Sequence, residues 1–207
     1  MNENPNDRQG ISYPKFREQF SVLDFDVERE VPVISLFDMP ERIPKEQATI
    51  TATDLEGQIR ISTWKDLKTL PEIRVRSPLI CQIFNWAEVV DCEGWKLKTV
   101  LGYLGISGEE NKHYSFHSRD GNYFETLTQE EAIDERAILS YRMNGEYLSH
   151  EHGGPLRLII PFLQGYKSVK WVDRIYCSHE DPKGIKIILK QSKTAKLSDR
   201  LKAEYSF

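Results

Sequence analysis

The sequence predicts a single α+β domain. Its 207 residues are enough for one domain with a substantial core and too few for a second full one. Apolar residues fall in short alternating or compact runs, which are typical of strands. The expected helices are short, and Gly or Pro ends them. A hydrophobic fraction of 39% and a charged fraction of 29% are ordinary for a water-soluble domain.

The chain divides into three parts. Residues 1–20 are polar and interrupted by Pro5 and Pro14, so we expect an extended or disordered lead-in. The domain is expected over 21–190, and its first part, up to Pro44, is predicted to be loop and short strand. Residues 191–207 form a C-terminal tail in which leucines alternate with charged residues, as in a short amphipathic helix.

The first half of the domain shows local signals for each element. Residues 48–62 alternate around a turn at Glu56-Gly57, which predicts a β-hairpin. Thr63 is a suitable N-cap for a helix over 64–70 that Pro71 ends. The compact apolar run 79–84 predicts a buried strand, and 93–97 lead into a helix closed by Gly105.

The second half is predicted mainly as strands. Strands are expected over 113–117, 137–143, 172–177 and 184–189. Thr128 and Glu131 have the spacing of a capping box, so a short helix should follow Thr128.

One stretch, residues 144–171, has a composition suited to binding an anion. Arg157 offers a planar fork that matches phosphate, and Lys167 and Lys170 add mobile point charges. Glycines nearby allow backbone N–H groups to approach a ligand closely. The expected local structure is strand, basic loop, strand around the apolar segment 158–160.

Charge and cysteine usage narrow the possible classes of function. The net charge of −4 argues against a general nucleic-acid or membrane-surface binder. No apolar run approaches the roughly 20 residues of a membrane span. The polar N-terminus lacks the apolar core of a secretory signal, so a cytoplasmic protein is expected. Cys81, Cys92 and Cys177 are an odd number at wide spacing, which suits neither a disulfide framework nor a CxxC zinc pair and predicts reduced thiols, one of which could serve as a ligand.

Three motifs within residues 144–171 carry a family resemblance: Asn-Gly-Glu from Asn144, His-Gly-Gly-Pro-Leu-Arg-Leu from His152, and Gly-Tyr-Lys-Ser-Val-Lys-Trp from Gly165. Together they resemble the oxidoreductase molybdopterin-binding domain of the sulfite oxidase family. The resemblance implies a mixed β-sheet core and a molybdenum-molybdopterin cofactor. The cofactor contacts that it implies are Asn144, His152, Arg157, Lys167, Ser168 and Lys170.

The resemblance also implies a cysteine that ligates molybdenum from an upstream strand. Cys81 lies at the family spacing from Glu93-Gly94 and is the predicted ligand and catalytic residue. Two departures concern the pocket wall: Trp86 is one position further from the cysteine than is usual, and Cys92 replaces a tryptophan. Cationic surroundings would favour the ligating thiolate. The competing interpretation is a buried thiol that acts as a small hydrophobe.

For several residues within 144–171, a purely structural role is the alternative to cofactor binding. In an extended strand, Lys167 and Ser168 would face opposite sides, so the lysines and Ser168 cannot all reach one ligand without a bulge. The alternative is that these side chains form a solvated basic edge of a strand and bind no ligand. Asn144 could bind the cofactor or fix a turn. His150 and His152 resemble a zinc pair, but no other histidine has motif spacing.

The predicted function is two-electron oxygen-atom transfer to or from a small sulfoxide, N-oxide or sulfite-like substrate. The apolar and aromatic Phe84-Asn85-Trp86 favours a neutral substrate, whereas an oxyanion would need converging arginines, for which Arg119, Arg136 and Arg142 are candidates by position. The alternative is a non-catalytic binding module that keeps the fold. Because the chain has no flavin or haem motif, an enzyme would need an external electron-transfer partner.

Overall fold

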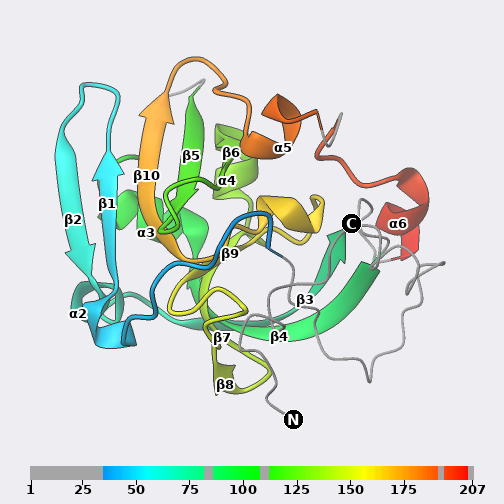
Figure 1. Ribbon diagram of the computed structural model, residues 1–207, viewed down its shortest axis with the longest axis horizontal. Coiled ribbons are helices and arrows are strands. Elements are labelled where there is room, and N and C mark those ends of the chain that lie inside the picture. The colour runs from blue at the N-terminus through cyan, green and yellow to red at the C-terminus, as the bar shows by residue number, and fades with distance from the viewer. Residues whose placement is uncertain (1–34, 82–85, 108–111, 191–193, 205–207) are drawn as a thin grey trace, which may run out of the picture.

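The structure, a computed structural model, describes residues 35–81, 86–107, 112–190 and 194–204. Two β-sheets and several short helices make up this part of the chain (Figure 1). The strands are β1 (Thr49–Thr53), β2 (Ile59–Thr63), β3 (Ile73–Cys81), β4 (Trp86–Lys96), β5 (His113–Ser118), β6 (Phe124–Thr128), β7 (Ile138–Met143), β8 (Glu146–Tyr147), β9 (Arg157–Ile159) and β10 (Val172–Ser178). The helices are η2 (Lys45–Gln47), α2 (Trp64–Leu67), α3 (Leu97–Tyr103), α4 (Gln129–Ile133), η3 (Gly165–Lys167), α5 (Ile185–Ile188) and α6 (Asp199–Glu204).

The two sheets differ in strand direction. The first sheet, sheet A, has the order β2-β1-β10-β5-β6 and is mixed, because β1 and β10 run parallel while its other neighbours are antiparallel. The second, sheet B, has the order β3-β4-β7-β8 with β9 also paired to β7, and all of its pairs are antiparallel. The predicted α+β class with a mixed sheet core is therefore confirmed.

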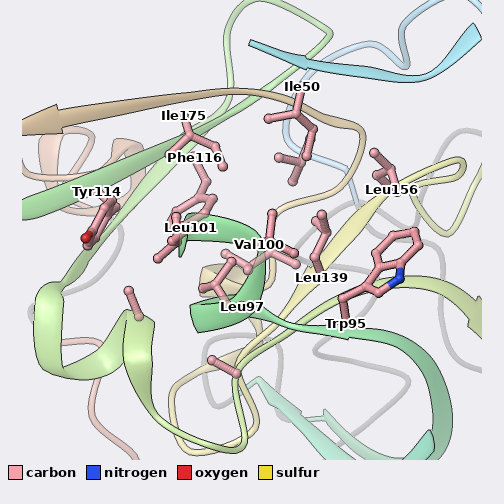
Figure 2. Close-up of a cluster of buried hydrophobic side chains, with 14 of the residues drawn as sticks. Ile50, Trp95, Leu97, Val100, Leu101, Tyr114, Phe116, Leu139, Leu156 and Ile175 are labelled. Carbon is pink, nitrogen blue, oxygen red and sulfur yellow. The ribbon is translucent and has the colours of Figure 1, made fainter. Parts of the chain in front are cut away.

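The main core lies between the inner face of sheet A and helix α3. Figure 2 shows Ile50, Phe116 and Ile175 of sheet A above Val100 and Leu101 of α3. A second cluster, which we call the sheet B cluster, consists of Leu79, Cys81, Val90, Cys92, Ile138, Met143, Leu148 and Ile159. Leu197 and Leu201 of the tail pack on Ile80 and Ala87, on the other face of β3 and β4.

Local signals in the sequence placed the turns and caps correctly. The β1–β2 turn has Gly57 at φ 79°, and the Asp54 carboxylate accepts hydrogen bonds from the backbone N–H groups of Glu56 and Gln58. Thr63 and Asp66 form a capping box at α2, and Thr128 and Glu131 form another at α4. The predicted C-terminal helix is also present, as α6.

Two predicted strands are wrong. Residues 184–189 form helix α5, because the N–H groups of Ile188 and Leu189 bond back to the carbonyls of Gly184 and Ile185. The run after Gly165 is a 3₁₀ turn, η3, and the strand that follows begins only at Val172. The predicted strand over 79–84 is part of β3, which begins earlier, at Ile73; its last residues lie outside the described part of the chain.

His117 on the outer face of sheet A gives a prediction about pH. Its ring stacks on Phe124 at 4.9 Å between centroids and meets Tyr176 edge-on at 4.9 Å. Burial, with Arg174 nearby, lowers the pKa of His117 from 6.5 to about 4. Between these values the unfolded chain binds more protons than the folded one, so stability is full above pH 6.5 and is lost as the pH falls towards 4.

We therefore expect the free energy of unfolding to fall by about 1–2 kcal/mol between pH 7 and pH 5, a figure discounted for the partial exposure of the ring. Urea denaturation at the two pH values measures this difference. The His117→Phe variant keeps the aromatic contacts and should lose most of the dependence. An unchanged dependence in that variant would assign it to other groups.

Among the described helices, none is both long enough and apolar enough to cross a membrane. All three cysteines are free thiols.

Candidate cofactor site

The turn that contains His152 and Gly153 is tied to the segment around Trp171. Gly153 has φ 98°, and a Cβ there would lie 2.7 Å from the Cβ of Lys170, so only glycine fits. The backbone N–H of Trp171 donates to the carbonyl of Gly153 at 3.1 Å, and its indole N–H donates to the carbonyl of His150 at 2.7 Å. The motif that starts at His152 and the one that starts at Gly165 are thus held against each other by hydrogen bonds and packing.

Arg157 projects from β9 into this region and is only 6% exposed. One guanidinium nitrogen donates to the carbonyl of His152 at 3.2 Å. Its Nε is buried and has no hydrogen-bond partner, and no described carboxylate forms an ion pair with it. Burial lowers the pKa of Arg157 to about 10. A buried cation without a counter-charge is costly to the fold, which is typical of a site that binds an anion.

Lys170 places a second cation beside Arg157. Its ammonium donates to the carbonyl of Glu151 at 2.7 Å. Burial and the like charge of Arg157 lower the pKa of Lys170 well below its usual range. Next to them, Nδ1 of His152 lies 2.9 Å from the hydroxyl of Ser149. Arg157, Lys170 and His152 are therefore brought together, and a bound phosphate or pterin oxygen would relieve the repulsion between the two cations.

The other three predicted contacts have different surroundings. Ser168 is buried, and its hydroxyl accepts a hydrogen bond from the N–H of Ile160 at 3.0 Å. Asn144 is exposed at the β7–β8 turn with φ 53°, and its side-chain oxygen accepts from the N–H of Asp91 at 2.9 Å. Asn144 therefore fixes a turn, one of its two predicted roles.

Lys167 forms a buried ion pair with Glu125. Its Nζ lies 2.9 Å from the carboxylate and donates to the carbonyl of Thr126 at 2.6 Å. Both side chains are almost fully buried, at 5% and 0% exposure. Burial raises the pKa of Glu125, and the neighbouring Lys167 charge lowers it. The 3₁₀ turn points Lys167 inward, so the alternation expected of a strand does not apply.

Breaking this pair is expected to destabilise the fold strongly. Lys167→Met leaves the Glu125 carboxylate buried without its cation, which costs about 3–5 kcal/mol. For a chain of this size, each kcal/mol lowers the melting temperature by about 2–4 °C. Thermal unfolding of Lys167→Met should show this loss, and the double variant with Glu125→Leu should recover much of it. An unaltered melting temperature in the single variant would exclude a structural role for the pair.

Cys81 ends strand β3 and meets the η3 turn. It is 5% exposed and belongs to the sheet B cluster. Ile80 forms a parallel bridge with Gln164, and a Cβ added at Gly165 would lie 3.5 Å from the Cβ of Cys81. The third sequence motif therefore begins directly against the predicted ligand, although the two are far apart in the chain.

Two polar side chains that the sequence did not point to interact electrostatically with Cys81. Lys186 of α5 is buried at 4% exposure; burial lowers its pKa, and the charges of Cys81 and Glu125 raise it again. Tyr123 donates to the carbonyl of Tyr166 at 2.7 Å. Burial, together with Glu125 and Cys81, raises the pKa of Tyr123. Tyr123 also interacts electrostatically with Arg157.

Cys92 is a weaker candidate for the ligand. It is fully buried, and burial raises the pKa of its thiol to about 12 despite the nearby Arg157. Cys177 lies on β10, away from the motifs, with its sulfur 3.9 Å from the carbonyl of Ile106. The buried Lys186 interacts electrostatically with Cys81, whereas the groups that shift the pKa of Cys92 include no lysine. Such a neighbour favours a thiolate.

The three arginines considered for an oxyanion substrate do not converge. Arg136 forms two hydrogen bonds with the Asp134 carboxylate, at 2.8 and 2.7 Å. Arg142 pairs with Glu93 at 3.2 Å, and Arg119 donates to the carbonyl of Glu41. In the described ranges, no three or more His, Cys, Asp or Glu side chains are grouped as a metal site would require, so the two histidines of the 150–152 turn form no zinc centre there.

Comparison with known families decides the classification. Residues 37–186 match the family described as the oxidoreductase molybdopterin binding domain. The chain belongs to this family. The resemblance read from the three motifs is thus confirmed, as is the predicted cofactor, molybdenum-molybdopterin.

Relatives of this molybdopterin-binding domain include several oxidoreductases. Sulfite oxidase from Arabidopsis thaliana is 31% identical over 169 residues, which cover 66% of this chain and 43% of that protein. The protein-methionine-sulfoxide reductase catalytic subunit MsrP from Pseudomonas syringae pv. tomato is 44% identical over 64 residues, 31% of this chain and 19% of that protein. The chain therefore spans less than half the length of either relative.

A solved structure supports the fold. The sulfane dehydrogenase SoxCD from Paracoccus pantotrophus matches with a TM-score of 0.61 over 90% of this chain and 57% of the other, at 18% identity. The buried, partnerless Nε of Arg157 and the thiol of Cys81 fit a cofactor that carries a phosphate and a metal.

Proposed function

We propose that the chain catalyses two-electron oxygen-atom transfer on a small substrate at a molybdenum ligated by Cys81. One observation carries the proposal: the segment 165–171 begins with Gly165 against Cys81 and ends with Trp171 hydrogen-bonded to Gly153, next to the His152 carbonyl that holds the buried Arg157. An anion-binding group and a thiolate donor at the two ends of one segment suit a cofactor that joins a phosphate to a metal.

Different residues of this chain would bind the cofactor and stabilise the thiolate ligand. Arg157 and Lys170 would hold phosphate and pterin oxygens by charge-assisted hydrogen bonds, and the carbonyl of His152 keeps the Arg157 fork in place. The ammonium of Lys186 would favour the thiolate form of Cys81. When bound, the cofactor supplies a metal that changes oxidation state by two electrons as an oxygen atom is transferred.

The overall reaction balances for reduction of an oxide: a sulfoxide or N-oxide, two protons and two electrons give the sulfide or amine and one water. The reverse describes oxidation of a sulfite-like substrate. MsrP is named for a methionine sulfoxide and the Arabidopsis relative for sulfite, so both classes are reasonable candidates. The electrons would come from or pass to an external electron-transfer protein. A cytoplasmic location remains a prediction, which fractionation of producing cells would test.

The deciding experiment is the molybdenum-to-protein ratio, measured by elemental analysis on protein from a cofactor-competent host supplied with molybdate. A ratio near one, with colour bleached by dithionite, would support the proposal and justify assays with sulfoxides, N-oxides and sulfite. A folded protein with a ratio near zero would favour the alternative, a binding module without redox chemistry.

A further inference from the structure

Strand β2 leaves one edge of sheet A open. It pairs with β1 on one side, and no other strand in the described part of the chain pairs with its other side, which we call the free edge (Figure 1). Natural proteins usually protect such an edge, because its backbone groups can pair with another strand. Here the register with β1 has no shift and β2 contains no proline, so neither a bulge nor a missing N–H group protects it.

The hydrogen-bond pattern shows which backbone groups point to the free edge. Just before β2, the N–H of Asp54 donates to the carbonyl of Gln58 at 3.1 Å. Antiparallel strands bond at every second residue, so the even-numbered residues of β2 bond to β1. Ile59 and Ile61 therefore turn their N–H and C=O groups towards the free edge.

The side chains of Ile59 and Ile61 make this edge apolar on the outer face of sheet A. They alternate with Arg60, which opposes the buried Ala52 on the inner face. Their exposed fractions, 66% and 65%, are the highest among the exposed large hydrophobic side chains of the described residues. Two such side chains beside free backbone groups indicate a surface that another strand covers.

A second copy of this chain can satisfy all of these groups at once. When a two-fold axis at Arg60 brings two β2 strands together in antiparallel order, Ile59 of one copy opposes Ile61 of the other. Both pairs are then hydrogen-bonded pairs, so each free N–H and C=O gains a partner. The isoleucines also pack against each other across the strands.

The two neighbouring symmetric registers fit less well. A shift in one direction would need the N–H of Thr63, which already donates to the Asp66 carboxylate at 2.8 Å. A shift in the other direction would need the N–H of Gly57, which already donates to the carbonyl of Asp54 at 3.2 Å. The free groups of β2 thus select the register centred on Arg60.

The charge of Arg60 is turned away from the free edge. Like charges that oppose each other across two strands repel, and Arg60 would oppose its own copy. Its guanidinium lies against Gly105 at the end of α3, since a Cβ at Gly105 would collide with it. Carbonyl groups at a helix C-terminus attract a cation, so α3 holds this group beneath the inner face of the sheet.

We propose that β2 is a homodimer interface, at which two five-stranded sheets A join edge to edge into one continuous sheet. A second copy fits better than a foreign strand, because the free groups and the isoleucines are both symmetric about Arg60. A short strand with two isoleucines from each copy covers less than the roughly 1,600 Å² of a standard interface. We therefore expect a weak dimer, with a Kd on the order of 100 µM. The proposal does not depend on the cofactor.

Sedimentation equilibrium of the full chain over about 5–500 µM measures the dimerisation. The wild type should pass from monomer to dimer across this range. Ile61→Lys places a charge at the pairing surface, as many natural edge strands do, and should raise the Kd by at least about tenfold. Ile133→Lys is the matched control: it changes another exposed isoleucine, 43% exposed on α4, and should leave the Kd unchanged.

Arg60→Cys tests the register. In the proposed dimer the two introduced thiols belong to a non-hydrogen-bonded pair with Cα atoms about 4.5 Å apart, a distance that a disulfide can span. Mild oxidation should link two copies through this position, which peptide mass spectrometry would show. Ile61→Cys is the comparison, because its thiol opposes Ile59 of the other copy and lies diagonal to its own counterpart. It should cross-link at least about tenfold more slowly.

Two results would overturn the proposal. A chain that stays monomeric at every concentration would exclude a second copy and leave a strand of a different protein as the occupant of the free edge. A dimer that Ile61→Lys leaves intact would show that another surface holds the copies together. Neither result concerns the molybdenum site, which the metal content tests separately.

Discussion

Cys81→Ala is expected to yield a folded protein that has lost its molybdenum-dependent turnover, with activity below about one-hundredth of wild type. The expected loss is large because changes even in residues that only support a metal ligand cost about 10–100-fold, and this change removes the ligand itself. The fold should tolerate it. Cys81 is a small buried side chain at a strand end, so its truncation costs roughly 1 kcal/mol.

The measurement compares molybdenum content, the absorption spectrum and turnover in the variant and the wild type. Cys92→Ala is the matched control, since it removes a thiol that is fully buried in the same cluster and whose pKa is raised to about 12 by burial. That variant should keep its metal and most of its activity. Retained turnover in Cys81→Ala, or loss only in Cys92→Ala, would reject Cys81 as the ligand.

How far the sequence predicted the fold depended on how local each signal was. Thr63 with Asp66, and Thr128 with Glu131, satisfy each other's backbone groups within four residues, so their helix starts could be read directly. Gly57 marks its turn in the same way. By contrast, Gly184–Leu189 is a short apolar run without clear alternation, and only the tertiary setting decides between strand and helix.

Only part of the candidate site could be predicted, because some of its contacts join residues that are far apart in the sequence. The motif gave Arg157 and Lys170, which lie together, but it could not show that Lys167 turns inward to Glu125. That ion pair joins segments distant in sequence, and no local pattern encodes it.

Arg157→Met is expected to change stability and cofactor binding in opposite directions. Without cofactor, Arg157 is a buried cation whose Nε has no partner, and methionine fills a similar volume without a charge. Even after loss of the hydrogen bond to His152, the free energy of unfolding should rise by about 1–2 kcal/mol. Cofactor binding should weaken by about 100-fold, as is typical when one partner of a buried charged contact is removed.

Both effects can be measured on protein from two hosts, one without cofactor biosynthesis for urea unfolding and one with limiting molybdate for metal content. Arg136→Met is the control, because that arginine pairs with Asp134 at the surface and its loss should alter stability by less than about 1 kcal/mol and leave metal content unchanged. If Arg157→Met lowers stability and metal content together, the arginine holds the fold and is not reserved for an anion. A gain in stability with loss of metal would show that the fold bears the cost of a buried charge in order to bind the cofactor.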